Sequence, residues 1–227
     1  ALDYYGRSLK IAEELSDKRG MEFSLNNIGI VHFDKGDYDT ALDYYGRSLK
    51  IAEELGNKRG MGDILNNIGS VHHDKGDYDK ALDYYNRSLA ICEELGDKYG
   101  MGYSLLSIGI VHNDKGDYDK AVDYLEKSLS IQKEIGMKAI ELETTTYLYL
   151  PYKHLGNEID VKVIHTLIKE TESIEFEINL RLYKLLEDES YLETAYNQVQ
   201  EKADNLEPDV KAKFLSYPIP KAIVEEW

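Results

Sequence analysis

The chain has 227 residues and a formal net charge of −16, with 27 Lys and Arg against 43 Asp and Glu. No basic stripe is present to neutralise phosphates, which argues against nucleic acid or an anionic membrane as a partner. One cysteine, Cys92, excludes an intrachain disulfide framework and a multi-cysteine metal site. With no membrane-length apolar run and no signal peptide, the sequence predicts a soluble, cytoplasmic piece of a longer chain.

The sequence repeats itself with a period of 40 residues. Residues 1–15, ALDYYGRSLKIAEEL, recur unchanged at 41–55 and with three changes at 81–95. Residues 1–40 and 41–80 share 32 of 40 positions, and residues 41–80 and 81–120 share 29. A fixed period of this size indicates stacked supersecondary repeats, each in contact only with its neighbours.

One repeat has the pattern of two helices joined by a tight turn. Residues 60–76 place apolar side chains at helical spacing, which predicts a first helix. Gly76 then predicts a left-handed helix stop, and Asp77 the N-cap of the next helix. Residues 78–95 carry a continuous apolar seam and predict a second helix that ends at Gly96.

In chain order, the sequence predicts a lone second helix at 1–16, hairpins at 17–56, 57–96 and 97–136, a degenerate hairpin at 137–172, and an atypical hairpin with capping helices at 173–227. Pro208, Pro218 and Pro220 divide the last part into two short helices. A solenoid needs an atypical last repeat to cover its final apolar face, so we interpret this tail as a structural cap.

The spacing within each repeat resembles the tetratricopeptide repeat family. In the first complete repeat, the characteristic positions are filled by Leu25, Ile28, Gly29, His32, Ala41, Tyr45 and Ser48. Gly29 and Ala41 are small where the helices approach closely, and Tyr45 fills the wider gap. The period of 40, without the proline that usually ends the second helix, resembles kinesin light chains and bacterial signalling proteins. The resemblance implies an all-α, right-handed superhelical solenoid of antiparallel helical hairpins.

The differences between these near-identical repeats gather on one face of the first helix. The resemblance implies that this face lines a concave groove that holds peptides. Neutral drift is the alternative, but several changes introduce apolar residues, which mark partner surfaces when exposed. The candidate groove residues are Phe23, Asn26, Asn27, Ile30, Phe33 and Asp34, then Asp63, Asn66, Asn67, Ser70, His73 and Asp74, then Tyr103, Leu106, Ile110, Asn113 and Asp114.

Asparagines repeated along a groove can follow a peptide backbone, because an amide both donates and accepts hydrogen bonds. The string LNNIG at 25–29 and 65–69 resembles the signature of kinesin light chains and of bacterial peptide-sensing regulators, whose groove asparagines hold the ligand. A solvated helix face is the alternative. Asp34, Asp74 and Asp114 favour a partner with Lys or Arg. We therefore expect a neutral or basic protein or peptide segment with apolar anchors.

Catalytic and metal chemistry is not predicted. His32, His72 and His112 recur at positions two helix spacings apart, roughly 16–20 Å, so one metal ion cannot reach two of them. We interpret them as core residues in place of the family's tyrosine. The recurring DKGDYD string lacks the ligand spacing of an EF-hand. No phosphate-binding loop or nucleophile elbow is present, so we expect no enzyme activity and no cofactor.

These observations lead to one main hypothesis and two alternatives. The main hypothesis is a protein- or peptide-binding scaffold whose groove holds a segment of another protein or of its own full-length chain. The first alternative is the regulatory or sensor arm of a larger signalling enzyme, a nucleotide cyclase, kinase or signalling ATPase, whose catalytic domain lies outside this chain. The second is self-association through the truncated ends of the array.

Overall fold

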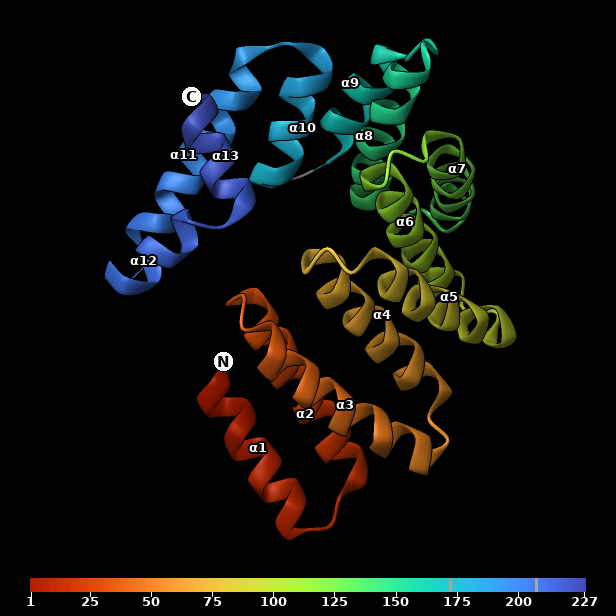
Figure 1. Cartoon of the computed structure of the whole chain (residues 1–227), viewed down its shortest axis with the longest axis vertical. Helices are drawn as coiled ribbons and strands as arrows, with labels where there is room; N and C mark the ends of the chain where they lie inside the picture. The colour runs from red at the N-terminus through yellow and green to blue at the C-terminus, as the bar shows by residue number, and fades with distance from the viewer. Residues whose placement is uncertain (172, 207) are drawn as a thin grey trace. The chain divides into compact units, whose positions relative to one another are not determined.

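The computed structural model describes residues 1–171, 173–206 and 208–227, which form helices and no strand (Figure 1). Residue 172, the end of the predicted degenerate hairpin, and residue 207, in the predicted tail, lie outside the described residues. The helices are α1 (Leu2–Glu14), α2 (Lys18–Asp34), α3 (Tyr38–Leu55), α4 (Lys58–Asp74), α5 (Tyr78–Leu95), α6 (Lys98–Asp114), α7 (Tyr118–Ile135), α8 (Lys138–Leu155), α9 (Val161–Glu170), α10 (Phe176–Leu186), α11 (Glu189–Asp204), α12 (Pro208–Leu215) and α13 (Pro218–Glu226). Within the described part, no helix has the length and apolar character needed to cross a bilayer.

The chain divides into two compact units, residues 1–131 and 132–227. In the first unit, α1 to α6 follow one another side by side and each packs against the next (Figure 1). The first helices of successive hairpins, α2, α4 and α6, also contact one another. This arrangement brings equivalent residues of neighbouring repeats together on one surface.

Each turn in the repeats contains a residue with left-handed backbone geometry. The predicted helix stop at Gly76 is confirmed by its φ of 78°. Asp77 occupies the predicted N-cap position, but its side chain accepts no capping hydrogen bond. The reason is competition, because the Asp77 carboxylate interacts with His72 at 3.4 Å and with Lys80 at 3.4 Å instead.

The two helices of a hairpin meet at a glycine. A Cβ atom added to Gly29 would lie 2.6 Å from the ring of Tyr45, which explains why a small residue must face the tyrosine. Nearby, Ser48 Oγ donates to the carbonyl oxygen of Glu22 at 2.8 Å. The equivalent serines, Ser88 and Ser128, repeat this bond, so the hydroxyl ties the two helices together.

The recurring histidines join the first helix to the second. His32 stacks on Tyr44 at a ring-centroid distance of 5.6 Å, and its Nδ1 lies 3.0 Å from an Asp37 carboxylate oxygen. The same stack recurs for His72 on Tyr84. Among the described residues, no group of three or more His, Cys, Asp or Glu side chains could hold a metal ion. The geometry gives these histidines a packing role.

The second unit contains α8 to α13. Its apolar core is formed by α10, α11 and the two last helices, with the buried residues Phe176, Leu180, Leu192, Ala195, Val199, Ala203, Phe214 and Ile223. The short helices α12 and α13 pack against α11, and Trp227 stacks on Tyr196 at 5.5 Å. The tail therefore covers the apolar side of α11.

Candidate peptide-binding face of the first helices

The candidate site lies on α2, α4 and α6, which we call the A helices. We define the A-helix face as the predicted groove residues that these helices carry, namely Phe23, Asn26, Asn27, Ile30, Phe33, Asp34, Asp63, Asn66, Asn67, Ser70, His73, Asp74, Tyr103, Leu106, Ile110, Asn113 and Asp114. Contacts of α4 with α2 and with α6 bring residues of neighbouring repeats together. The hydrogen bonds on this face show which side chains already have partners within the chain.

The asparagines form a bond between helices at one contact. Asn67 Nδ2 donates to Asn26 Oδ1 at 3.1 Å, which links α4 to α2. Asn27 instead donates to the carbonyl oxygen of Phe23 in its own helix at 2.7 Å. Asn26, Asn27 and Asn67 thus have protein partners before any ligand binds.

Asn66 differs from Asn26 although the two occupy equivalent positions. Its side-chain oxygen Oδ1 is buried and has no hydrogen-bond partner. The residue equivalent to Asn67 in the next repeat is Ser107, whose shorter side chain makes no bond to Asn66. The Oδ1 atom of Asn113, one repeat further along this face, is also buried without a partner. Such atoms are rare and costly in native structures.

The predicted apolar stripe is exposed at one end only. Phe23 is 62% exposed, with its ring edge-on to Tyr5 at 6.5 Å. Leu106 is 4% exposed and belongs to the core. The remaining apolar or aromatic members of the face, Ile30, Phe33, Tyr103 and Ile110, are half-buried. Phe23 is therefore the member best placed to contact a partner.

His73 bridges the α4–α6 contact. Its Nε2 lies 2.8 Å from Asp114 and its Nδ1 lies 3.2 Å from Asp74. Burial by itself would lower the pKa of His73, but the hydrogen bonds to Asp114 and Asp74 and the charges of both carboxylates together raise it to about 9. The imidazole ring of His73 is thus protonated and positively charged at neutral pH.

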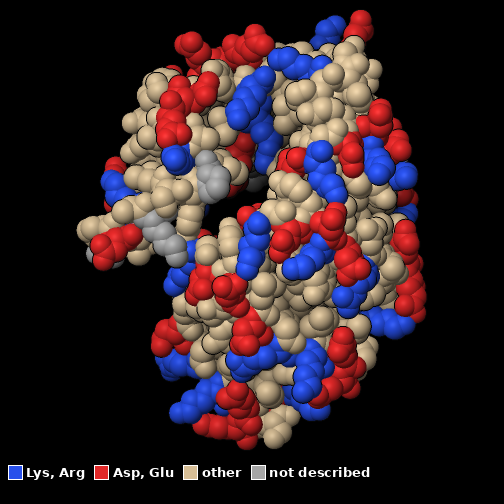
Figure 2. Space-filling model, in the orientation of Figure 1, with Lys and Arg blue, Asp and Glu red and all other residues tan. Residues whose placement is uncertain are grey.

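Some of the aspartates on the A-helix face already have partners within the chain. Asp74 also accepts a hydrogen bond from Tyr38 at 3.2 Å, and Asp114 is held by His73. Asp34 is exposed, and its charge adds to the effect of burial in raising the pKa of Tyr45. In the lower part of Figure 2, which shows the first repeats, Lys and Arg side chains lie among Asp and Glu.

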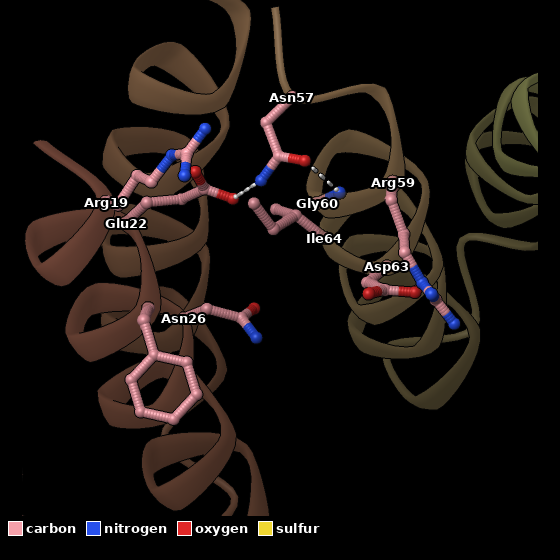
Figure 3. A pocket seen from close by; sticks show the side chains of 9 residues that line it. Arg19, Glu22, Asn26, Asn57, Arg59, Gly60, Asp63 and Ile64 are labelled. Atoms are coloured by element: carbon pink, nitrogen blue, oxygen red, sulfur yellow. Dashed lines mark hydrogen bonds between the residues drawn. The ribbon is translucent and has the colours of Figure 1, made fainter. Parts of the chain in front are cut away.

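A cavity of about 290 Å³ opens between α2 and α4. It is lined by Arg19, Glu22, Phe23, Asn26, Asn57, Arg59, Gly60, Asp63 and Ile64 (Figure 3). Glu22 and Asn57 are not among the site residues predicted from the sequence. The signal was present, because their counterparts in the next repeat are Gly62 and Asp97.

The fold and this face define a helical-hairpin repeat scaffold of the protein-binding type. A sequence model described as Tetratricopeptide repeat matches residues 1–54 and 60–134. The chain belongs to the tetratricopeptide repeat family. A sequence search of curated proteins found no match.

Solved structures share the fold at low sequence identity. A Rap protein complexed with competence and sporulation factor is 19% identical, with a TM-score of 0.66, over 99% of this chain and 58% of that one. A STAND protein with a tetratricopeptide repeat sensor from Pyrococcus horikoshii is 17% identical, with a TM-score of 0.62, over 99% and 34%. Nearly identical repeats of a kinesin light chain from Podosopora anserina are 15% identical, with a TM-score of 0.53, over 89% and 94%.

These likenesses concern the fold alone, since all three identities are low. They confirm the predicted all-α solenoid of tetratricopeptide repeats and the resemblance to kinesin light chain and signalling proteins of this class.

Proposed function

We propose that the A-helix face binds a segment of a protein or peptide and that Asn66 accepts a hydrogen bond from its backbone. The observation that carries this proposal is the buried Asn66 Oδ1 atom without a partner. Its counterpart Asn26 receives a bond from Asn67, whereas Ser107 leaves Asn66 without one. The chain therefore holds an unsatisfied acceptor on a half-buried residue of the A-helix face, and a rotation of the Asn66 amide would present it to a ligand N–H.

The energetics favour a ligand at this position. A buried acceptor that lacks a partner costs about 1–3 kcal/mol, and a bound backbone N–H would recover part of it. Main-chain hydrogen bonds provide affinity for many extended segments without reading their sequence. The exposed Phe23 ring offers an apolar contact for an anchor side chain. The Rap complex with competence and sporulation factor supports binding by this fold.

The partner is expected to be neutral or basic. The formal charge of −16 favours encounter with cations at low salt. Asp63 is exposed on the A-helix face, where its carboxylate can attract a positively charged group. Asp114 contributes less, because its carboxylate already interacts with His73.

The test uses two substitutions that act on the same atom in opposite ways. Asn66→Ala removes the acceptor, and Ser107→Asn supplies the missing donor from within the chain. Peptides selected from a displayed library on the wild-type protein are measured for affinity against both variants. We expect Asn66→Ala to weaken binding by about 0.5–1.5 kcal/mol with little change in thermal stability. We expect Ser107→Asn to weaken binding as well while raising the melting temperature.

The matched control is Glu53→Gln, an exposed substitution on α3 away from the A-helix face. It should leave peptide affinity unchanged. The proposal fails if Ser107→Asn raises stability but every selected peptide binds as tightly as before. Equal losses of stability and affinity in Asn66→Ala would also contradict it, because they would indicate a purely structural asparagine.

A second function, the sensor arm of a larger signalling enzyme, is favoured by one observation. The STAND protein carries a tetratricopeptide repeat sensor of this fold, and the present chain covers 34% of that protein. Reading the full-length gene tests this directly. A catalytic or ATPase domain in the flanking sequence supports the sensor, and flanks without such a domain contradict it.

Self-association through α1 stays a prediction. Tyr4 on α1 and Leu15, the C-cap residue that follows α1, are each 73% exposed. The equivalent of Tyr4 in the next repeat, Tyr44, is instead stacked against His32. Light scattering over a range of protein concentrations tests whether this face associates. A monomer at every concentration would contradict it.

A further inference from the structure

The cavity between α2 and α4 contains a buried charge that no cation pairs. Glu22 is 7% exposed, and its Oε1 atom accepts a hydrogen bond from Asn57 Nδ2 at 2.7 Å. Its second carboxylate oxygen has no hydrogen-bond partner, and no ion pair reaches it among the described residues. Because this second oxygen is not itself fully buried, it remains accessible to a positively charged guest in the cavity.

The cations that line the cavity do not occupy this position. Arg59 points away from Glu22 in Figure 3, and its Nε lies 3.5 Å from Asp97 with the side chain 70% exposed. Arg19 lies at the rim beside Glu22 and is exposed to water, where its attraction is screened. Arg19 also forms no ion pair with any carboxylate in the part of the chain that the structure describes.

Asp63 adds a second carboxylate from the opposite wall. Desolvation raises the pKa of Asp63, Arg59 opposes this rise, and the charges of Asp97 and Glu22 reinforce it. The net direction of the pKa is upward because desolvation and the two carboxylates together outweigh the positive charge of Arg59. A cation placed between Glu22 and Asp63 would be attracted by both.

The cavity is built by departures from the repeat. Glu22 has glycine at its equivalent positions, Gly62 and Gly102, and Asn57 replaces the aspartate found at Asp97. Gly60 provides the space for the carboxylate, because an added Cβ there would overlap Glu22 Oε1. Glu22 and Asn57, the two residues that depart from the repeat, both line this cavity. The cavity is therefore specific to the α2–α4 contact.

We infer that this cavity binds the ammonium group of a lysine side chain in the bound segment. The volume of about 290 Å³ is at the lower end for ligand pockets and suits one long side chain. Ile64 and the exposed ring of Phe23 would contact the aliphatic stem, and the ring face also attracts a cation. A lysine ammonium suits two separate carboxylates because its donors point in several directions, unlike the planar fork of arginine.

This inference rests on the proposed function for the source of the lysine, but its chemistry is tested alone. The probes are Nα-acetyl-lysine amide, which keeps its free side-chain ammonium group, and Nα-acetyl-norleucine amide, which lacks that charged group. Both are titrated into the ¹⁵N-labelled protein, and the amide signals of Gly60 and the Asn57 side chain are followed. We expect saturable shifts with the lysine probe, no comparable shifts with norleucine, and weaker binding at higher salt.

The decisive variant is Glu22→Gln, which keeps an oxygen for Asn57 and removes the charge. We expect it to weaken lysine-probe binding at least tenfold, whereas Glu53→Gln, a charge-matched exposed control, changes it less than twofold. Equal binding of the norleucine probe, unchanged binding in Glu22→Gln, or equal loss in Glu53→Gln each overturns the inference. Ser107→Asn should not affect the lysine probe, so failure here is distinguishable from failure of the proposed function.

Discussion

The α2–α4 and α4–α6 contacts share a scaffold but carry different side-chain chemistry. In each hairpin, a lysine at the start of the A helix pairs with a glutamate near the end of the second helix of the same hairpin, as in Lys18–Glu54 and Lys58–Glu94. On the A-helix face, however, the α2–α4 contact contains the Asn67–Asn26 bond, whereas the α4–α6 contact contains the His73–Asp114 bridge.

The difference shows that the hairpin scaffold and the A-helix face change independently. Ser107 removes an asparagine bond and His73 adds an ionic bridge, yet the helices of both repeats begin and end at equivalent residues. The residues that hold the hairpins together are repeated, and those that could contact a partner are not. Substitutions of each kind should therefore have opposite consequences for stability and binding.

The largest effect is expected where the scaffold is constant. Gly69 faces the ring of Tyr85, and an added Cβ would lie 2.6 Å from it. Gly62, in the same helix, would place a Cβ 3.6 Å from its nearest neighbours. We expect Gly69→Ala to lower the free energy of unfolding by about 2–3 kcal/mol through overpacking. Gly62→Ala should raise it by about 0.5–1 kcal/mol through helix propensity.

Chemical denaturation of both variants measures this contrast. The two substitutions are chemically identical and lie two helical turns apart, so each controls for the other. A loss of stability in both variants would contradict the expectation that only Gly69 must stay small to accommodate a close helix contact.

The scaffold could be predicted from the sequence because it depends on short-range sequence patterns. The Gly76 stop and the helix periods depend on local geometry, and the repeat supplies the packing partner of each glycine. The tetratricopeptide resemblance gave the fold for the same reason. Because the repeats are nearly identical, the helix pattern interpreted for one hairpin applies to all three.

The candidate site was predictable only in outline. The sequence placed the variation on the A-helix face but could not pair side chains across helices, such as Asn67 with Asn26. It also could not show that Leu106 is buried, because neighbouring helices cover a position that the helical pattern of one repeat places on the exposed side. Glu22 was missed because its role depends on Asn57, 35 residues away.

The next effect tests what is special to the α4–α6 contact. Because the pKa of His73 is raised to about 9 in the folded chain, its bridge stabilises the fold fully below the ordinary value of 6.5. That stability is lost as the pH rises through about 9. His73→Asn, which introduces the residue found at Asn113, should lower the free energy of unfolding by about 2 kcal/mol at pH 7.

Thermal melts of wild type and His73→Asn from pH 6 to pH 10 give the readout. The difference between the two melting temperatures should shrink toward zero above pH 9. A constant difference across this range would show that His73 acts through packing rather than charge. Phe33→Asn, at the equivalent position of the preceding repeat, controls for pH effects elsewhere in the chain.

The smallest effect concerns the turn that precedes α2, where the scaffold itself departs from the repeat. Ser16 has a φ of 54°, whereas its counterparts Gly56 and Gly96 have φ values of 63° and 64°. A residue with a Cβ atom pays a steric cost of about 1 kcal/mol in this region, and glycine does not. Ser16→Gly should therefore raise the free energy of unfolding by up to about 1 kcal/mol and leave lysine-probe binding unchanged, because it alters the turn and not the A-helix face. Gly56→Ser is the reverse control and should lower stability by a similar amount. If Ser16→Gly instead destabilised the chain, the greater freedom of glycine in the unfolded state would outweigh the relief of strain at this turn.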